Sequence, residues 1–319
     1  MGQGEKESKH NTVVISDKKS GLPFSRGILA SSIAVAGLEM VTAHKIASDV
    51  QGYFTDNNIR SITLDELRSL AFRFIKEEAG LENAEKYLLW QSVGKLHKPT
   101  IILVGGATGV GKSTVATVLA SRLNITRVAS TDAIREVMRA SVSERLIRPL
   151  RGSSYSAYKN LTLPPTGVEP VILGFREQVL AVNVGIEAII KRSVEEKTDI
   201  VIEGAHVVPG YLDTARYDDK AIIISMLIAV PDKDVHKEHF AKRTVETQGS
   251  RPVQRYIKHL DKILMIQDYL EDLAAKNNVS IIQNYNLDNT VKKALELVFK
   301  TVKDQFDRLG TEYAHGSGA

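Results

Sequence analysis

One stretch of the chain, residues 101–114, combines an apolar run, a glycine-rich turn and the start of a helical pattern. Residues 101–104 are rich in β-branched side chains, and residues 115–120 read as a helix. Between them, the spacing Gly-x-x-x-x-Gly-Lys-Ser runs from Gly106 to Ser113 and matches the phosphate-binding P-loop pattern. This pattern constrains the fold strongly, because it needs a buried strand, a tight loop and a helix in immediate succession.

The residue types of this loop favour binding of a nucleoside triphosphate. The alternative is a glycine-rich turn that is followed by a lysine by chance. Glycine takes positive φ angles and lets the backbone approach a ligand without a Cβ clash. The loop N–H groups then converge on phosphate oxygens, helped by the positive end of the following helix. In such a loop Lys112 reaches the β- and γ-phosphates, and the Ser113 hydroxyl is placed to bind Mg²⁺. The expected nucleotide contacts are Gly106, Ala107, Thr108, Gly109, Val110, Gly111, Lys112, Ser113 and Thr114.

Composition excludes several other classes of protein. A length of 319 residues suits two domains, and 43% hydrophobic with 25% charged residues is ordinary for a globular protein. The absence of cysteine excludes disulfides, thiolate metal sites and thiol nucleophiles. No apolar run approaches the roughly 20 residues of a membrane span, and the polar start does not read as a signal peptide. A cytoplasmic protein is therefore expected, and a net charge of +4 is too small to argue for nucleic acid.

The first hundred residues read as a small, mainly helical domain. Residues 12–16 are typical of a short strand, and apolar residues recur at helical spacing in four segments between residues 25 and 93. Polar tails are expected at both ends of the chain. The predicted division is a tail over 1–11, a helical domain over 12–95, a second domain over 96–309 and a tail over 310–319.

After Pro99, strand and helix patterns alternate. Strands are predicted at 123–128, 199–204, 221–228 and 279–283, in addition to the strand before the P-loop. Alternation of this kind implies an α/β fold with a parallel sheet flanked by helices. Residues 141–170 lack periodicity, and their arginines, hydroxyls and tyrosines favour a segment that encloses a substrate.

Two carboxylates are expected beside the P-loop, since ligands gather at the carboxyl ends of parallel strands. Asp132 follows one predicted strand, which is expected to lie next to the P-loop strand. There it either caps the next helix or accepts a proton or holds the metal. Glu203 ends an apolar strand in the Walker B manner and serves either Mg²⁺ or the substrate. His206 lies beyond it, and either phosphate binding or donation to a backbone carbonyl suits it.

Cations and hydroxyls suited to an anionic substrate lie in three places. Arg135 and Arg139 are one helical turn apart, and Ser153, Tyr155 and Arg176 belong to the segments that follow. A basic tract typical of a lid contains Lys242, Arg243, Arg251 and Arg255, although a solvated basic face is the alternative. The nearby histidines 236 and 239 have neither a third ligand nor HExxH spacing, so no metal site is predicted there.

Together these motifs resemble archaeal 2-phosphoglycerate kinase. The resemblance rests on residues 105–114, 130–139, 153–155 and 202–210, and it covers the chain from about Val13 to Lys303. Residues 23–26, 43–47 and 84–87 resemble the ATP-cone, a regulatory nucleotide-binding module, and that family carries such a segment ahead of its P-loop domain. The fold then implied is a P-loop kinase-type parallel sheet preceded by a small, mainly helical ATP-cone-like domain.

The resemblance implies transfer of the ATP γ-phosphoryl group to the 3-hydroxyl of 2-phospho-D-glycerate. The products are ADP and 2,3-bisphosphoglycerate, on the way to cyclic 2,3-diphosphoglycerate. Lys112, Asp132 and Glu203 are then the expected catalytic residues, and Ser113, Asp132 and Glu203 the expected Mg²⁺ ligands. The expected partner is a small phosphorylated hydroxy acid, without nucleic acid or membrane, and a homo-oligomer is left open. Alternatives are a kinase of a nucleoside or sugar phosphate, an ATP-binding regulator and a nucleic-acid end kinase.

Overall fold

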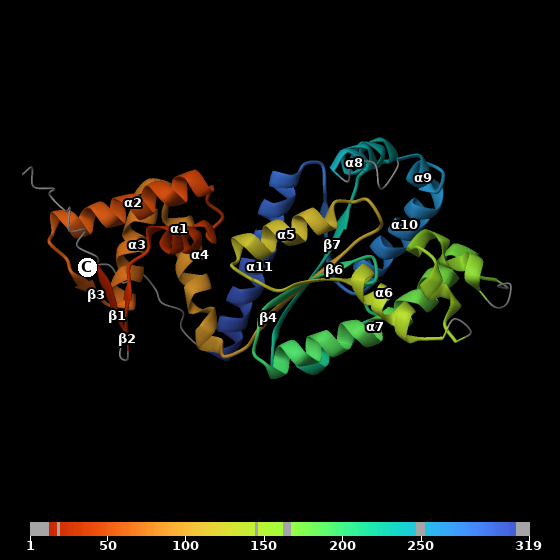
Figure 1. The fold of residues 1–319 in the computed structure, drawn as a ribbon, viewed down its shortest axis with the longest axis horizontal. Coiled ribbons are helices and arrows are strands. Elements are labelled where there is room, and N and C mark those ends of the chain that lie inside the picture. Colours follow the sequence, from red (N-terminus) through yellow and green to blue (C-terminus); the bar gives the residue numbers. More distant parts are fainter. Residues whose placement is uncertain (1–12, 18–19, 144–145, 162–166, 247–252, 311–319) are drawn as a thin grey trace, which may run out of the picture. The chain divides into compact units, whose positions relative to one another are not determined.

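The computed structural model describes residues 13–17, 20–143, 146–161, 167–246 and 253–310. The described chain divides into two compact units (Figure 1). The first contains the described residues up to Lys95 together with those from Phe306 onward, and the second extends from Leu96 to Gln305.

The first unit combines a three-stranded sheet with a group of helices. Strand order is β2-β1-β3, with β2 antiparallel and β3 parallel to β1. Thr63 and Glu66 form a capping box at the start of the third helix, which satisfies backbone N–H groups that a helix leaves unpaired. The elements are β1 (Val14–Asp17), β2 (Ser20–Pro23), α1 (Arg26–Ala34), α2 (Met40–Asp56), β3 (Ser61–Ile62), α3 (Leu64–Ala79) and α4 (Leu81–Ser92).

Apolar residues spaced along these helices converge on one core. Phe54, Ile46 and Ile75 are almost completely buried in it, and the Phe24 ring meets the Phe54 ring edge-on at 5.0 Å. The helical segments predicted here agree with α1 to α4 because burial requires the periodicity that the sequence shows. Strand β3 was not predicted, since two residues carry no measurable alternation.

The second unit is built on a five-stranded, all-parallel sheet with the order β5-β6-β4-β7-β8. Its strands are β4 (Thr100–Gly105), β5 (Val128–Ser130), β6 (Ile200–Gly204), β7 (Ile222–Ala229) and β8 (Ser280–Gln283). Its helices are α5 (Lys112–Arg122), α6 (Thr131–Ser141), α7 (Pro170–Glu195), α8 (Lys233–Glu246), α9 (Val253–Ile257) and α10 (Leu260–Lys276), with most of α11 (Leu287–Leu309). The short 3-10 helices of this unit are η2 (Arg148–Arg151), η3 (Ser154–Asn160) and η4 (Ala215–Tyr217), and η1 (Val93–Leu96) spans the point where the chain passes from the first unit to the second.

The central strand β4 is buried along its whole length, which explains why its sequence is a continuous apolar run. Ile101 and Leu103 face a core that they share with Val182 and Ile186 of α7. Helices α5 and α7 lie on opposite sides of the sheet (Figure 1). This is the α/β fold with a flanked parallel sheet that the alternation of elements predicts, and it agrees with a P-loop kinase-type fold.

The second predicted strand exists, but its start and its place in the sheet were predicted wrongly. It was expected over residues 123–128, ahead of Ser130, whereas α5 extends to Arg122, Asn124 turns the chain with a φ of 54°, and β5 covers Val128–Ser130. The expectation that this strand adjoins the P-loop strand was also wrong, because β6 lies between β5 and β4. Strand order depends on long-range pairing, so periodicity along the chain could not reveal it.

Candidate active site

The P-loop connects β4 to α5 at the carboxyl edge of the sheet. Gly106, Gly109 and Gly111 have φ angles of 149°, 89° and 87°, a region that side chains with a Cβ rarely adopt. A Cβ on Gly106 would lie 2.4 Å from the Ile228 carbonyl oxygen, and one on Gly109 would lie 2.1 Å from the Phe240 ring. Glycine is therefore required at these positions by conformation and by packing.

Lys112 and Ser113 are at the first turn of α5, where the helix N-terminus favours an anion. The Lys112 ammonium group lies across the loop and donates a hydrogen bond to the Ala107 carbonyl oxygen at 3.1 Å. Ser113 and Thr114 are exposed. A cation, two hydroxyls and the loop N–H groups thus share one edge of the sheet, which suits a polyphosphate.

Glu203 ends β6, the strand next to the P-loop strand. It is paired in register with Val104 on one side and Ser130 on the other, and it is only 7% exposed. The sheet therefore places this carboxylate between the P-loop and the start of α6. That position agrees with either role predicted for Glu203, the metal or the substrate.

Asp132 lies in the first turn of α6, one strand further from the P-loop than Glu203. Its side chain is 68% exposed, and its Oδ1 atom lies 3.7 Å from the Nε atom of Arg135. Lys112 begins α5 after β4, and Asp132 and Arg135 belong to the first half of α6 after β5. Because the strands are parallel, the starts of both helices lie at the carboxyl end of the same sheet.

Arg135 holds a loop as well as facing the site. Its guanidinium group donates to the carbonyl oxygens of Leu150 and Gly152 at 3.0 and 3.2 Å, and it pairs with Glu136 at 2.6 Å. Arg139 pairs with the same glutamate. The Arg135 side chain is only 14% exposed, so much of its hydrogen-bonding capacity serves the segment 148–152.

His206 takes part in a buried side-chain network. Its Nδ1 atom lies 2.9 Å from the Thr131 hydroxyl, and its Nε2 atom lies 3.0 Å from Oε1 of Gln178. The Gln178 amide nitrogen donates to the carbonyl oxygens of Pro149 and Gly152, so Oε1 accepts, Nε2 of His206 carries the proton, and Nδ1 accepts from Thr131. Neither predicted role for His206 is seen in these contacts, because both ring nitrogens bond to side chains.

Burial lowers the pKa of His206 to about 4, with the Lys112 and Arg135 charges adding to the shift and Asp132 opposing it. The folded protein thus binds this proton less readily than the unfolded chain, whose histidine has a pKa of 6.5. Stability due to His206 is complete above about pH 6.5 and declines as the pH falls toward 4, by roughly 3 kcal/mol in total.

We expect a His206→Gln variant to show a flatter dependence of unfolding free energy on pH than the wild type over this window. Urea unfolding at about pH 7 and about pH 4.5 measures the difference. Comparison with the wild type cancels the contributions of other groups, such as Asp199, whose pKa burial raises. Parallel pH profiles for the two proteins would contradict the assignment of a buried neutral imidazole.

The remaining predicted substrate residues occupy different environments. Ser153 caps η3, and Tyr155 is 3% exposed with its ring stacked on His259 at 5.2 Å. Arg176 is exposed on α7. Lys242 and Arg243 belong to α8 and Arg255 to α9, but their side chains, and the whole of Arg251, lie outside the described residues. The substrate and lid roles of these residues stay predictions.

Several polar residues at the site were not predicted. The Ser154 hydroxyl lies 3.1 Å from that of Thr108 in the P-loop, and Lys262 donates to the Tyr158 hydroxyl at 2.6 Å. Lys262 lies on α10, far from these residues in sequence, so no sequence motif could predict its contact with Tyr158. Ser154, in contrast, falls inside the segment 153–155 that was singled out from the sequence.

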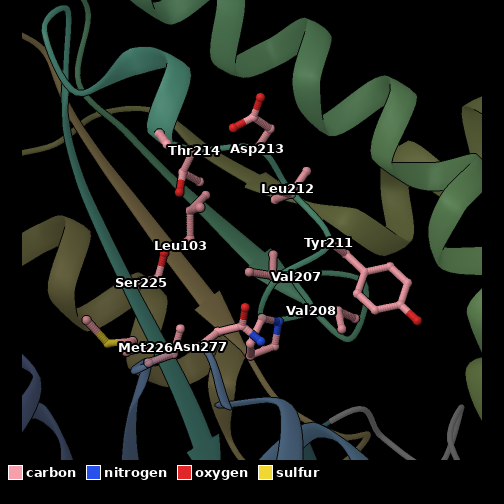
Figure 2. A pocket seen from close by; sticks show the side chains of 14 residues that line it. Leu103, Val207, Val208, Tyr211, Leu212, Asp213, Thr214, Ser225, Met226 and Asn277 are labelled. Carbon is pink, nitrogen blue, oxygen red and sulfur yellow. The ribbon is translucent and has the colours of Figure 1, made fainter. Parts of the chain in front are cut away.

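A cavity of about 480 Å³ opens beside the sheet, between β4, β7 and the segment 207–215 (Figure 2). Leu103, Ser225 and Val207 line its wall, with Asp213 and Thr214 at one end and Asn277 at the other. None of its lining residues is a lysine, arginine or histidine, and one, Asp213, is acidic. The cavity therefore offers no cationic side chain to an anionic ligand.

Two further observations concern membranes and metals. Within the part of the chain that the structure describes, no helix is both long and apolar enough to cross a membrane. The same residues contain no cluster of three or more His, Cys, Asp or Glu side chains arranged to hold a metal ion.

Comparison with known proteins identifies the family. No protein-family model matches the chain. It is 42% identical to 2-phosphoglycerate kinase of Pyrococcus horikoshii over 292 residues, which are 91% of this chain and 95% of that protein. It is 38% identical to 2-phosphoglycerate kinase of Methanothermobacter thermautotrophicus over 290 residues (90% and 94%). For that of Thermococcus kodakarensis the identity is 39% over 292 residues (92% and 98%). The chain belongs to the 2-phosphoglycerate kinase family.

Proposed function

We propose that this protein transfers the γ-phosphoryl group of ATP to the 3-hydroxyl of 2-phospho-D-glycerate. The products are 2,3-bisphosphoglycerate, a precursor of cyclic 2,3-diphosphoglycerate, and ADP. The observation that carries the proposal is the P-loop with Glu203 on the adjoining strand, in a chain that matches 2-phosphoglycerate kinases over nine-tenths of its length.

The donor half of the reaction belongs to the P-loop. Its N–H groups and the Lys112 ammonium group bind the β- and γ-phosphates and offset the charge that shifts between them during transfer. The loop stands at the N-terminus of α5, so the helix dipole favours the same anion. Little covalent chemistry is left to the protein, and positioning with charge neutralisation supplies most of the rate.

The acceptor half needs a proton acceptor and cations. The 3-hydroxyl oxygen forms a bond to the γ-phosphorus while the bond from that phosphorus to the β,γ-bridging oxygen breaks, and the hydroxyl proton passes to a carboxylate. Asp132 and Glu203 are the candidates, since Asp132 follows β5 and Glu203 lies near the end of β6, and both strands end at this edge. Arg135, Arg139 and the lid cations are the proposed contacts of the substrate's phosphate and carboxylate groups.

Magnesium fits the residues present. Ser113 offers a hydroxyl and Glu203 or Asp132 a carboxylate, which are the hard oxygen ligands that Mg²⁺ prefers. When bound with the nucleotide, the ion neutralises part of the phosphate charge.

A panel of acceptors tests the proposed substrate. We expect ATP-dependent ADP release with 2-phosphoglycerate and background rates with 3-phosphoglycerate, uridine and ribulose 5-phosphate, because the site must fit one arrangement of phosphate, carboxylate and hydroxyl. A coupled assay for ADP measures all four, with an ATP-only reaction as the control. Faster turnover of uridine or ribulose 5-phosphate would replace the acceptor by a nucleoside or a sugar phosphate.

The first unit has a separate proposed role as an ATP-cone-like nucleotide sensor. Support comes from the sequence segments that resemble that module, of which residues 23–26 join β2 to α1. A sensor of this kind would bind a second ATP per chain. Calorimetry on the full-length protein counts the sites, and a single site would rule the sensor out.

A further inference from the structure

The carbonyl groups of the P-loop need hydrogen-bond donors that the P-loop motif does not itself contain. When loop N–H groups turn inward toward an anion, neighbouring carbonyl groups turn outward into the protein, and buried carbonyls need donors. Two such donors come from distant parts of the chain. His236 Nε2 lies 2.8 Å from the Thr108 carbonyl oxygen, and Asn284 Nδ2 lies 2.9 Å from that of Val110.

His236 is held in one orientation and one tautomer. It is fully buried on α8, and its ring stacks on Phe240 at 4.8 Å with the planes 19° apart. A carbonyl only accepts, so Nε2 carries the hydrogen, and Nδ1 is buried with no hydrogen-bond partner among the described residues. Burial also lowers the pKa of His236, which keeps the ring neutral. The ring can therefore act only as a donor to the P-loop.

Phe240 extends the same contact along the loop. A Cβ on Gly109 would lie 2.1 Å from this ring, so the side chain packs directly against the glycine backbone. The ring is completely buried and stacks on Tyr256 of α9 at 4.7 Å. The ring that stacks on His236 therefore also contacts the P-loop backbone at Gly109.

Asn284 approaches the loop from the segment after β8. Its side chain is 4% exposed, and a Cβ on Gly111 would lie 2.4 Å from its Nδ2 atom. The Val110 carbonyl only accepts, so the amide atom that faces it is Nδ2, and Oδ1 is left 2.8 Å from the buried Thr290 hydroxyl. The Asn284 amide therefore packs against Gly111 while it donates to the Val110 carbonyl.

We propose that His236 and Asn284 are positioning residues that hold the Thr108 and Val110 carbonyls outward and so preset the P-loop N–H groups for the triphosphate. Neither residue needs to touch the nucleotide. The inference rests on the proposed function in one respect, namely that ATP binds at this loop. Its consequence is that ATP affinity depends on two residues more than 120 positions away in sequence.

Direct binding of Mg·ATP to the full-length protein, without acceptor, tests the inference. We expect His236→Leu and Asn284→Leu each to raise the Kd at the P-loop about tenfold, because each leaves a buried carbonyl without its donor. His236→Gln, which can donate from its amide nitrogen, should stay within about threefold of the wild type. Thr290→Val should weaken binding less than Asn284→Leu, since it releases the amide without removing it.

Kinetics and matched controls separate positioning from a general loss of structure. At saturating ATP, the KM for 2-phosphoglycerate should not change in His236→Leu or Asn284→Leu. Lys237→Ala, an exposed position on the same helix as His236, and Lys292→Ala, an exposed position on α11 after Asn284, should bind ATP like the wild type. Wild-type affinity in His236→Leu, or equal weakening in His236→Leu and His236→Gln, would overturn the inference.

The binding measurement also separates this inference from the choice of acceptor. If the wild type binds ATP but does not phosphorylate 2-phosphoglycerate, the proposed acceptor fails while the affinity ratios still decide the inference. If the wild type shows no ATP site that depends on Lys112, both are overturned.

Discussion

Replacing Lys112 with alanine is expected to reduce kcat/KM for ATP by at least about 10²–10³-fold, the range found when one charge-stabilising group is lost from an active site. Lys112 stands at the start of α5, and its ammonium group already bends over the loop to the Ala107 carbonyl oxygen. In the reaction it follows the charge that develops between the β- and γ-phosphates. ADP release at saturating 2-phosphoglycerate measures the loss.

The stability of the Lys112→Ala variant should change little, because the side chain is only partly buried and makes no core contact of large area. Lys112→Arg keeps the charge but has a planar, forked head group in place of a compact ammonium, so it should recover only part of the activity. Thermal unfolding serves as the folding control. Activity of Lys112→Ala within about tenfold of the wild type would show that the P-loop is not the donor site.

The Lys112→Ala variant also tests whether the first unit binds ATP. If that unit binds its own ATP, calorimetry on Lys112→Ala should still detect one site per chain while the P-loop site is lost. Complete loss of binding, together with a single site in the wild type, would remove the nucleotide-sensor proposal and leave the kinase proposal intact.

Replacing Glu203 with glutamine is expected to lower kcat by about 10²–10⁴-fold, the usual contribution of a positioned acid–base group. Glutamine keeps the shape of this buried side chain and removes its charge, so the sheet should tolerate it. The register with Val104 places Glu203 directly beside the P-loop strand. We therefore expect the variant also to need a higher Mg²⁺ concentration for half-maximal rate.

Asp132→Asn is the comparison that separates the two carboxylates. Asp132 is exposed and lies beyond β6 as seen from the P-loop strand, so its loss should reduce kcat without changing the Mg²⁺ requirement. Steady-state rates at several Mg²⁺ concentrations distinguish the two variants. A higher Mg²⁺ requirement in Asp132→Asn and an unchanged one in Glu203→Gln would assign metal binding to Asp132 instead of Glu203.

Local chemistry explains which features could be predicted from the sequence. The P-loop is a contiguous pattern whose glycines are required by their own φ angles, so its strand, turn and helix are all visible in one short stretch. The long helices are likewise periodic, because one face of each is buried. The ends of helices and strands were predicted less accurately, because they depend on tertiary contacts that the periodicity of the sequence does not show. The strand predicted to begin at residue 123 is an example, since β5 begins at Val128.

The positions of the two acidic residues could be predicted only in part. A carboxylate that ends an apolar strand predicts a site at the sheet edge, and Glu203 lies there. Which carboxylate is nearer the P-loop depends on strand order, and β6 lies between β5 and β4. The prediction placed the strand that precedes Asp132 next to the P-loop strand, whereas strand order is set by packing across the whole sheet.

The sequence by itself determined the nucleotide loop, the class of fold and, through its likeness to relatives, the family. Each depends on contiguous residues or on summed similarity along the chain. Only the tertiary structure decided that His206 bonds to Thr131 and Gln178, and that His236 and Asn284 support the P-loop carbonyls. Those contacts join residues separated by 28 to 174 positions, and a buried polar group takes whichever partner folding brings within about 3 Å.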